Sequence, residues 1–378
     1  MKRILILTLR PLHNGPRIIR EINTLKSNYE ITVVGLTKPE IKGVKFYNIL
    51  QVHKSIIDRL LRKVYRLFRG GEPPMFKLPH LSTFTNRVIK REKPDIIILH
   101  EPDFFPYMFK TKHKRKYKVV FNAHEYYPLQ FESRPRWSET YGKFYRKLYE
   151  NYLLHVDLMV NVCDTIADKC LSEFNKPSIV IPNAAAYDAR INVQESKGLP
   201  LRLIHHGVAI RARGLETMIE AVGTLEGLFE LDLMLVQNHK DYFDELKSKA
   251  ALTKNVRIIP PVSFDEIVPF ISSYDIGLYI LKPNSFNQEA ALPNKLFEFI
   301  QARLCLVVGP SLEMSRVVRR HKVGVVAKDF SVDSLVELLK GLRLEDVHKF
   351  KTNSDIAARE LCAENYEDLF LNSILSLK

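Results

Sequence analysis

Short apolar runs of three to five residues alternate with helical stretches along most of the chain, and this alternation is the feature that most constrains the fold. Each run is β-branched or aliphatic and is bounded by polar or turn residues. Such runs are typical of strands that are buried on both faces of a parallel sheet. The runs are Ile4–Leu7, Ile31–Gly35, Ile96–Leu99, Val119–Asn122, Leu158–Val162, Ile179–Ile181, Arg202–His206, Asp232–Val236, Val256–Ile259, Ile276–Ile280 and Cys305–Val308.

The series of strands restarts at Arg202, after the polar stretch Tyr187–Gly198. Helices between successive parallel strands give βαβ units and doubly wound α/β sheets. A chain of 378 residues is about the length of two such domains. We therefore predict an α/β fold with two Rossmann-like domains and a cleft between them, over residues 1–190 and 199–355, with a helix within 356–378.

Composition and charge narrow the class of protein. Hydrophobic residues make up 46% and charged residues 26% of the chain, which is typical of a globular protein. The four cysteines lack the spacing of a zinc site or a disulfide framework. There is neither an apolar run that could span a membrane nor a signal-peptide core, so we expect a cytoplasmic location. The net charge of +14 favours an anionic partner: nucleic acid, an anionic membrane surface or a phosphorylated substrate.

The segment Ile56–Arg69 has the pattern of a basic amphipathic helix, with apolar side chains on one face and almost only Lys and Arg on the other. Two interpretations stay open: an ordinary domain helix with a solvated basic face, and a helix that docks on an anionic membrane surface, where each cation contributes roughly 1 kcal/mol. The basic connection Lys110–Lys118 could reinforce the same surface. Nucleic acid is not an expected partner because no RNA- or DNA-binding motif is present.

The segment Pro293–Glu298 predicts a phosphate site. Pro293 suits the first turn of a helix, where its missing N–H is not needed. The open N–H groups of that turn and the positive end of the helix dipole can hold a phosphate. Lys295 adds a cation, and Glu298 supplies a carboxylate one turn later that can accept hydrogen bonds from sugar hydroxyls. A nucleotide-sugar needs this combination.

A second basic position, Arg213, comes just before a predicted helix, Leu215–Val222, and soon after the strand that ends at His206. Ligands of a doubly wound sheet bind at the carboxyl ends of its strands. A guanidinium there can stabilise the charge that develops on a departing diphosphate. An ordinary surface arginine is the alternative interpretation.

Several short motifs occur in a fixed order along nearly the whole chain. They are Gly15–Glu21 (GPRIIRE), Pro94–Glu101 (PDIIILHE), Asn122–Pro128 (NAHEYYP), Val156–Val162, Ile181–Asn183, His206–Gly207, Arg213–Glu216 and Pro293–Glu298. In this order the sequence resembles a GT-B glycosyltransferase of the retaining family 4, or "group 1", type. The resemblance implies two Rossmann-like domains and a last helix that crosses back to the first domain.

The resemblance also implies roles for residues of the second domain. Glu298 would bind the nucleotide ribose, and Arg213 would contact the diphosphate, with Arg211 in reserve. The family often carries a second glutamate that touches the donor sugar, at a position that Ala290 occupies here; Glu289 is one residue away and could replace it. The phosphates would be contacted by Asn294, Lys295 and Leu296.

In the first domain, the resemblance places His124 near the sugar and the acceptor, and Gly15 would allow the first loop to approach the ligand closely. It implies a retaining hexosyltransferase that uses a nucleoside-diphosphate sugar as substrate and requires neither a cofactor nor a metal ion. The acceptor would be a lipid-linked glycan or a surface polysaccharide such as lipopolysaccharide, reached by a peripheral position on the inner face of the membrane. A non-catalytic sugar-nucleotide-binding relative and a GT-B epimerase or phosphorylase are the alternatives.

Overall fold

The computed structural model describes residues 1–12, 15–49, 79–109 and 116–377. It divides the chain into two compact units. The N-terminal unit contains Met1–Pro182, Ser285–Asn287 and Glu367–Lys378, and the C-terminal unit contains Asn183–Asn284 and Gln288–Tyr366. The helix predicted over Ile56–Arg69 and most of the basic connection Lys110–Lys118 lie outside the described residues.

The N-terminal unit is built on a seven-stranded sheet in the order β3-β2-β1-β4-β5-β6-β7, with every pair of neighbours parallel. Ile4 in the middle of the sheet lies opposite Ile31 on one side and Ile96 on the other. The strands are β1 (Lys2–Leu7), β2 (Tyr29–Gly35), β3 (Lys45–Asn48), β4 (Ile96–Leu99), β5 (Lys118–Asn122), β6 (Leu158–Asn161) and β7 (Ile179–Val180).

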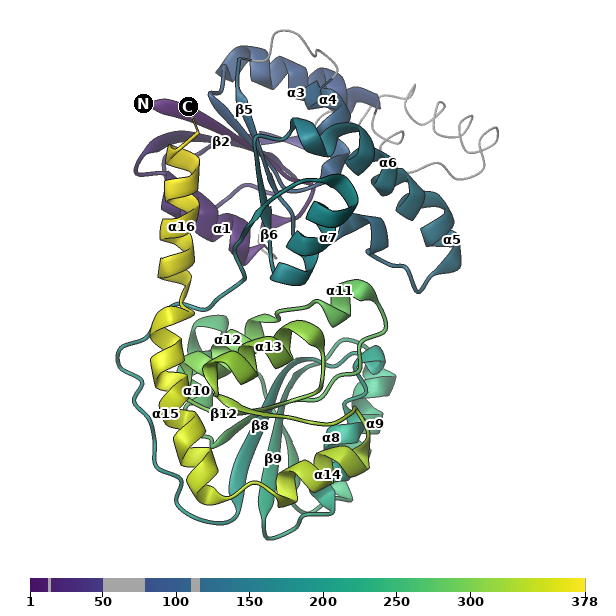
Figure 1. Ribbon diagram of the computed structural model, residues 1–378, viewed down its shortest axis with the longest axis vertical. Coiled ribbons are helices and arrows are strands. Elements are labelled where there is room, and N and C mark those ends of the chain that lie inside the picture. The colour runs from purple at the N-terminus through teal and green to yellow at the C-terminus, as the bar shows by residue number, and fades with distance from the viewer. Residues whose placement is uncertain (13–14, 50–78, 110–115, 378) are drawn as a thin grey trace. The chain divides into compact units, whose positions relative to one another are not determined.

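Helices cover both faces of this sheet (Figure 1). The first helix shows why the sequence folds in this way, because Ile18, Ile22 and Leu25 recur at helical spacing and pack on Ile4 and Ile31 of the sheet. The helices are α1 (Pro16–Leu25), α3 (Pro79–Glu92), α4 (Phe105–Phe109), α5 (Pro135–Trp137), α6 (Lys143–Tyr152) and α7 (Asp164–Phe174).

The C-terminal unit contains a six-stranded parallel sheet in the order β10-β9-β8-β11-β12-β13. Its strands are β8 (Leu201–Val208), β9 (Phe229–Val236), β10 (Val256–Ile259), β11 (Ile276–Tyr279), β12 (Cys305–Val308) and β13 (Gly324–Val326). Its helices are α8 (Glu216–Gly223), α9 (Lys240–Ala251), α10 (Ile267–Ile271), α12 (Asn294–Gln301), α13 (Leu312–His321), α14 (Val332–Lys340) and α15 (Leu344–Glu360). The short helix α11 (Phe286–Glu289) is divided between the units, because its first two residues are assigned to the N-terminal unit.

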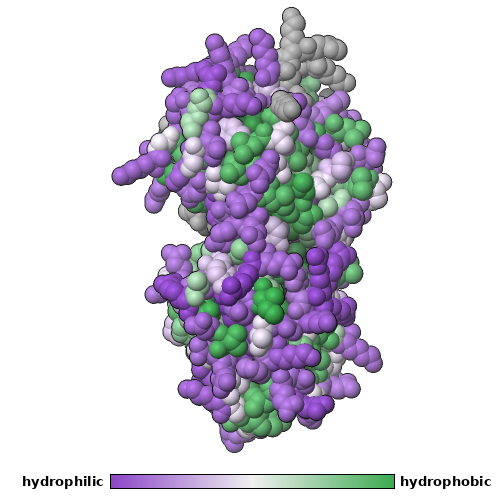
Figure 2. Space-filling model, turned by 60° about the vertical axis from the view of Figure 1, so that its left-hand side comes forward, coloured by the Kyte–Doolittle hydropathy of each residue, from purple (hydrophilic) through white to green (hydrophobic). Residues whose placement is uncertain are grey.

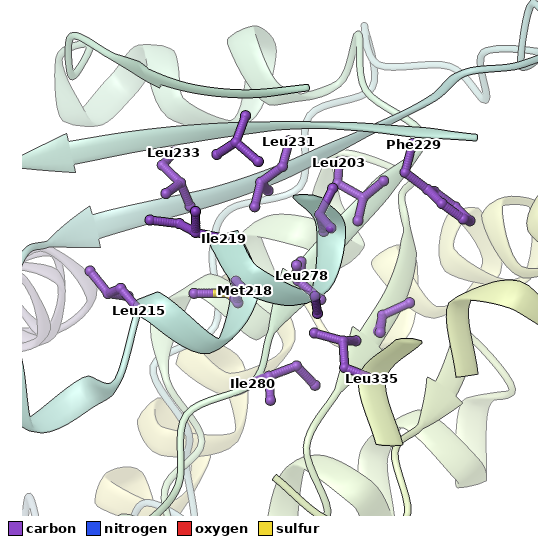
Figure 3. Close-up of a cluster of buried hydrophobic side chains, with 14 of the residues drawn as sticks. Leu203, Leu215, Met218, Ile219, Phe229, Leu231, Leu233, Leu278, Ile280 and Leu335 are labelled. Atoms are coloured by element: carbon purple, nitrogen blue, oxygen red, sulfur yellow. The ribbon is translucent and has the colours of Figure 1, made fainter. Parts of the chain in front are cut away.

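Alternate residues of these strands contribute side chains to two separate hydrophobic cores, one on each face of the sheet. On one face, Leu203 and Leu231 pack with Met218 of α8 and Leu335 of α14, and their side chains converge in Figure 3. On the other face, Ile204 packs with side chains of α12 and α13. Since successive side chains of a strand point to opposite faces, a continuous apolar run supplies both cores.

The last helix, α16 (Ala363–Leu375), contributes Phe370 and Ile374 to the core of the N-terminal unit, where they pack with Ile18 and Ile22 of α1. Within that unit, α16 lies beside α1 (Figure 1). This arrangement confirms the predicted return of the C-terminal helix to the first domain.

All eleven predicted strands are present, and the prediction of two Rossmann-like sheets is confirmed. Two strands were missed, β3 and β13, and both form an edge of their sheet. Their residues are partly or fully exposed, so they do not form the continuous apolar run that marks a buried strand.

Hydrophilic residues predominate on the face drawn in Figure 2, and hydrophobic residues gather there in separate patches. None of the helices in the described part of the chain combines the length and the apolar character that crossing a bilayer requires. None of the four cysteines forms a disulfide, and all four are buried.

Candidate active site

In the C-terminal unit, the strand order reverses between β8 and β11, which lie side by side at the centre of the sheet. Such a reversal leaves a crevice outside the carboxyl ends of the two strands, and ligands of doubly wound proteins bind there. Gly207 and Val208 end β8, and Tyr279 ends β11. The predicted donor site therefore has to be judged by which side chains reach these strand ends.

Two cations reach this point. A Cβ atom added to Gly207 would lie 2.6 Å from Nζ of Lys295 and 3.7 Å from Nη1 of Arg213, so both side chains pass over this glycine. Arg213 donates from Nη1 to the carbonyl oxygen of Val208 at 3.0 Å. Nζ of Lys295 lies 5.5 Å from the centre of the Tyr279 ring, within range of a cation–π interaction. Lys295 and Arg213 are thus brought together at the end of β8.

Neither cation forms an ion pair with a carboxylate within the ranges that the structure describes. Burial, together with the neighbouring Arg213 guanidinium, lowers the pKa of Lys295 to about 8. Two close positive charges without an ion-pair partner are costly in a partly buried position. An anion would remove that cost.

Beside Arg213 lies a pocket of about 280 Å³, with Gly214 and Thr217 on one side and Ile280 and Lys282 on another. Gly214 adopts a left-handed conformation, φ 58°, which turns the chain from Arg213 into α8. The pocket belongs wholly to the C-terminal unit and approaches the size of small-molecule sites, about 300–1,000 Å³.

Helix α12 presents its N-terminus in the same region. Asn294 is its first residue, Lys295 its second, and Pro293 precedes the helix as the N-cap with φ −70° and ψ 151°. The expectation that Pro293 lies inside the first turn is therefore off by one residue, since the last extended residue before a helix also tolerates proline. No side chain caps this end and no acidic residue lies in its first turn, which leaves it suited to an anion.

Leu296 is buried in the core and its amide donates to the carbonyl oxygen of Pro293, so it anchors the helix rather than offering a free N–H group. Glu298, one turn further, is only 5% exposed. Its Oε2 lies 3.3 Å from Nε2 of His206, without the alignment of a hydrogen bond. Burial and the positive Lys295 lower the pKa of His206 to about 3, so this imidazole is neutral.

Two predicted residues are not joined to this group by any contact in the described chain. Arg211 is exposed, donates to Glu245 at 2.6 Å and covers the Tyr242 ring, although it also lines the pocket. Glu289 ends the short helix α11 and is half-buried. Ala290, at the position where the resemblance implies a sugar-binding glutamate, is fully buried.

The N-terminal unit has its own reversal of strand order, between β1 and β4. Glu101, just beyond β4, accepts hydrogen bonds from the amide of Leu9 at 2.9 Å and from the Thr8 hydroxyl at 3.3 Å. Arg10 lies 3.5 Å from Glu101 and donates to Glu125 at 3.1 Å. The loop that follows β1 is therefore tied to the loops that follow β4 and β5.

His124 follows β5 at the same edge and is half-buried. Its Nε2 lies 3.0 Å from Nδ1 of His100, and Nε2 of His100 lies 3.2 Å from Glu21 of α1. Burial, as the largest cause, and the positive Arg17 and Arg10 hold the pKa of His124 well below its usual value. A neutral imidazole at a strand end can bind a sugar hydroxyl.

Gly15 is buried and caps the N-terminus of α1 with φ −120°, a value open to any residue. A Cβ atom there would meet its nearest neighbours at 3.6 Å, an ordinary contact. The rest of the described chain therefore does not require a glycine at this position, and its role toward a ligand stays a prediction.

Sequence reasoning did not single out Gly207, Tyr279, His100 or Glu21 as site residues. Gly207 carried a signal, because a glycine at a strand end shortly before an arginine indicates close approach of another group. Glu21 and His100 lie within the motifs GPRIIRE and PDIIILHE, which gave them no role, and Tyr279 carried no signal. The strand order is what brings all three to the two reversals.

The chain is similar to known glycosyltransferases in part of its sequence and in its fold. Residues 22–187 match the family model described as Glycosyltransferase Family 4. No curated protein sequence matches the chain. A glycosyltransferase from Rickettsia africae ESF-5 has a similar structure, with a TM-score of 0.72 and 13% identity, over 100% of this chain and 99% of that chain.

Two other known structures are also similar to this chain. One is trehalose-6-phosphate from E. coli bound with UDP-2-fluoro glucose, with a TM-score of 0.66 and 11% identity over 100% of both chains. The other is WaaG, a glycosyltransferase involved in lipopolysaccharide biosynthesis, with a TM-score of 0.61 and 12% identity over 97% of this chain and 99% of that chain. At identities this low, the structural similarity establishes a common fold alone.

Proposed function

Because residues 22–187 match the Glycosyltransferase Family 4 model and the whole chain has the fold of known glycosyltransferases, we propose that the protein is a retaining glycosyltransferase. It would take a sugar from a nucleoside-diphosphate donor held by Arg213, Lys295 and Glu298 and transfer it to a lipid-linked or surface-polysaccharide acceptor. The observation that supports the donor site most strongly is the pair of cations over Gly207 at the carboxyl end of β8. Asn294 and Lys295 would add the backbone N–H groups of the first turn of α12.

Each group has a physical reason to be there. When the glycosyl bond breaks, negative charge accumulates on the departing diphosphate, and fixed positive groups stabilise it without reorganisation. The buried carboxylate of Glu298 would accept hydrogen bonds from the ribose hydroxyls, which fixes the nucleotide in one orientation. Retention then follows from attack on the face that the diphosphate leaves, with the diphosphate itself assisting removal of the acceptor proton.

The acceptor part of the proposal is supported by charge. The chain has a net charge of +14, and the basic segment Ile56–Arg69 would suit an anionic membrane surface on the inner side, where lipid-linked acceptors are found. His124 and Gly15 in the N-terminal unit would lie near the sugars, and Glu289 would make the sugar contact that Ala290 cannot.

One observation favours a second candidate. Ala290 is fully buried at the position of the expected sugar-binding glutamate, which would suit a relative that binds a nucleotide-sugar without transferring the sugar. The two candidates share the nucleotide site and differ in turnover.

The first experiment is a thermal-shift screen with a panel of nucleoside diphosphates, followed by titration calorimetry and by assays of slow nucleotide-sugar hydrolysis. A ligand at a hundredfold excess over Kd stabilises the protein by about 2.7 kcal/mol. Glu298→Ala and Arg213→Ala should each weaken the response to the best nucleotide. A chain that responds to none of the nucleotides refutes the proposal, whereas binding without hydrolysis or transfer favours the second candidate.

The membrane part of the proposal has a separate test. Replacing Arg62, Lys63 and Arg66 with Glu should release the protein from anionic liposomes and leave nucleotide binding unchanged. If the parent protein does not bind such liposomes, or if the triple variant binds them equally well, Ile56–Arg69 does not dock on membranes.

A further inference from the structure

We infer that Glu21 and His100 are positioning residues, which fix the ring proton of His124 on Nε2 so that its Nδ1 is left as a hydrogen-bond acceptor for a sugar hydroxyl. The inference rests on the proposed function, since it gives His124 the sugar contact. It concerns two side chains that neither the motifs nor the comparisons assign to the site, and it lies wholly within the N-terminal unit.

The chain of hydrogen bonds begins at Arg17. Its Nη2 donates to Oδ1 of Asn122 at 2.6 Å, and because a guanidinium can only donate, this contact fixes the orientation of the Asn122 amide. The amide nitrogen of Asn122 then donates to Oε2 of Glu21 at 2.6 Å. Glu21 is 5% exposed and accepts at both carboxylate oxygens.

The second half of the chain passes through the two imidazoles. Oε1 of Glu21 accepts from Nε2 of His100 at 3.2 Å, which places the proton of His100 on Nε2. A neutral His100 then has an acceptor at Nδ1, and His124 must donate to it from Nε2 across 3.0 Å. Among the described residues His124 makes no other polar contact, so its Nδ1 carries a lone pair and no proton.

The inference takes His100 as a neutral imidazole, for a reason that lies in the charges beside Glu21. The buried carboxylate of Glu21 already has a buried cation nearby, the guanidinium of Arg17, which is 7% exposed. His100 is fully buried, and a second cation there would be desolvated without a carboxylate of its own. In the competing state, an imidazolium at His100 would donate from Nδ1 to Nε2 of His124, and the proton of His124 would then lie on Nδ1.

Replacing the carboxylate of Glu21 with an amide should reverse the direction of this series of hydrogen bonds. In Glu21→Gln, the side chain has one acceptor and one donor end. The fixed amide of Asn122 requires the acceptor end, so the donor end faces Nε2 of His100. His100 then carries its proton on Nδ1 and donates to His124, whose proton moves to Nδ1 in turn. The site would offer the sugar a donor in place of an acceptor.

The double variant Glu21→Gln with Asn122→Asp should restore the original direction of the hydrogen bonds. The new aspartate would accept from Arg17 and from the amide end of the new glutamine, so that the glutamine oxygen again accepts from Nε2 of His100. The side chains keep their sizes and the total charge matches the parent. A role in packing alone has no reason to respond to the first change and recover with the second.

Two measurements are needed. Long-range ¹H–¹⁵N spectra of histidine-labelled protein report which ring nitrogen carries the proton; the parent and the double variant should show Nε2–H at both histidines, and Glu21→Gln should show Nδ1–H at both. With a nucleotide-sugar and acceptor that the parent uses, kcat/KM should fall roughly 10- to 100-fold in Glu21→Gln and recover within a few-fold in the double variant.

Glu92→Gln is the matched control, because Glu92 is a similarly buried carboxylate of the same unit that binds Lys45 and Tyr47 instead. It should leave the spectra of His100 and His124 and the value of kcat/KM unchanged.

Parent spectra with a doubly protonated His100, or with Nδ1–H at His124, overturn the inference even if Glu21→Gln does not fold. Activity lost in Glu21→Gln and not regained in the double variant also overturns it. If the parent gives the expected spectra and binds no nucleotide, the proposed function is refuted and the proton arrangement is still supported.

Discussion

Replacing Gly207 with alanine tests the cation pair directly. The new Cβ atom would lie 2.6 Å from Nζ and 2.7 Å from Cε of Lys295, so the lysine has to retreat by about 0.8 Å to reach an ordinary contact distance. If the ammonium contacts a diphosphate at about 2.9 Å, a retreat to about 3.7 Å at an effective dielectric constant of about 20 costs roughly 1.2 kcal/mol per unit charge. Nucleotide affinity should then fall about sevenfold.

The same substitution strains the backbone, because Gly207 has φ +130°. A side chain in such a conformation costs of the order of 1–3 kcal/mol, which lowers Tm by about 2–4 °C per kcal/mol in a domain of this size. The two effects can be separated with Gly227→Ala. Gly227 has φ +81° in the same unit, and a Cβ atom there would have nothing within 4 Å.

Calorimetric titration with the best nucleoside diphosphate is the assay. Gly227→Ala should lose stability and keep its nucleotide affinity, while Gly207→Ala should lose both. In a background that carries Lys295→Met, Gly207→Ala should have little further effect on affinity, because the displaced charge is already absent. Unchanged affinity in Gly207→Ala, or full additivity with Lys295→Met, would refute the placement of the ammonium at the phosphates.

The remaining predictions concern pH, charge and packing. Because the pKa of Lys295 is lowered to about 8, the ammonium form that binds a diphosphate is present below pH 8 and is lost above it. Nucleotide affinity should therefore fall about tenfold from pH 7 to pH 9 in the parent and stay constant in Lys295→Arg. Equal pH dependence in both proteins would contradict this. Arg213→Ala should weaken nucleotide binding in calorimetry more than Arg211→Ala, since Glu245 already pairs with Arg211; the reverse order would assign the phosphate contact to Arg211. Phe370→Ala should destabilise the protein by about 3–5 kcal/mol in denaturant unfolding, and the more exposed Leu369→Ala by well under half of that; equal losses would mean that α16 does not anchor in the core.

The sequence allowed the buried part of the fold to be predicted because buried parallel strands leave a continuous apolar pattern. The run from Ile4 to Leu7 is fully buried in the centre of its sheet, as its composition indicated. Strand β3, with the sequence KFYN, lies at an edge where its residues are partly exposed, and such a strand has no pattern that separates it from a loop.

The candidate site was predictable only in part, and for a related reason. Lys295 and Glu298 are separated by one helical turn, so their proximity follows from the chain itself. Gly207, Arg213 and Lys295 come from β8, from the turn before α8 and from α12, and their meeting depends on β8 and β11 being neighbours. The strand order is a property of the sheet, and no residue type records it.

By itself, the sequence determined two Rossmann-like domains, the buried strands of their sheets and the resemblance to family 4 glycosyltransferases, and it predicted a phosphate site at the start of α12, because these features depend on neighbours along the chain. Tertiary structure alone decided that Lys295 passes over Gly207, that Arg211 turns to Glu245, and that Glu21 and His100 stand behind His124. These contacts join residues up to about ninety positions apart. Only the strand order and the helix packing within each unit bring such residues into contact.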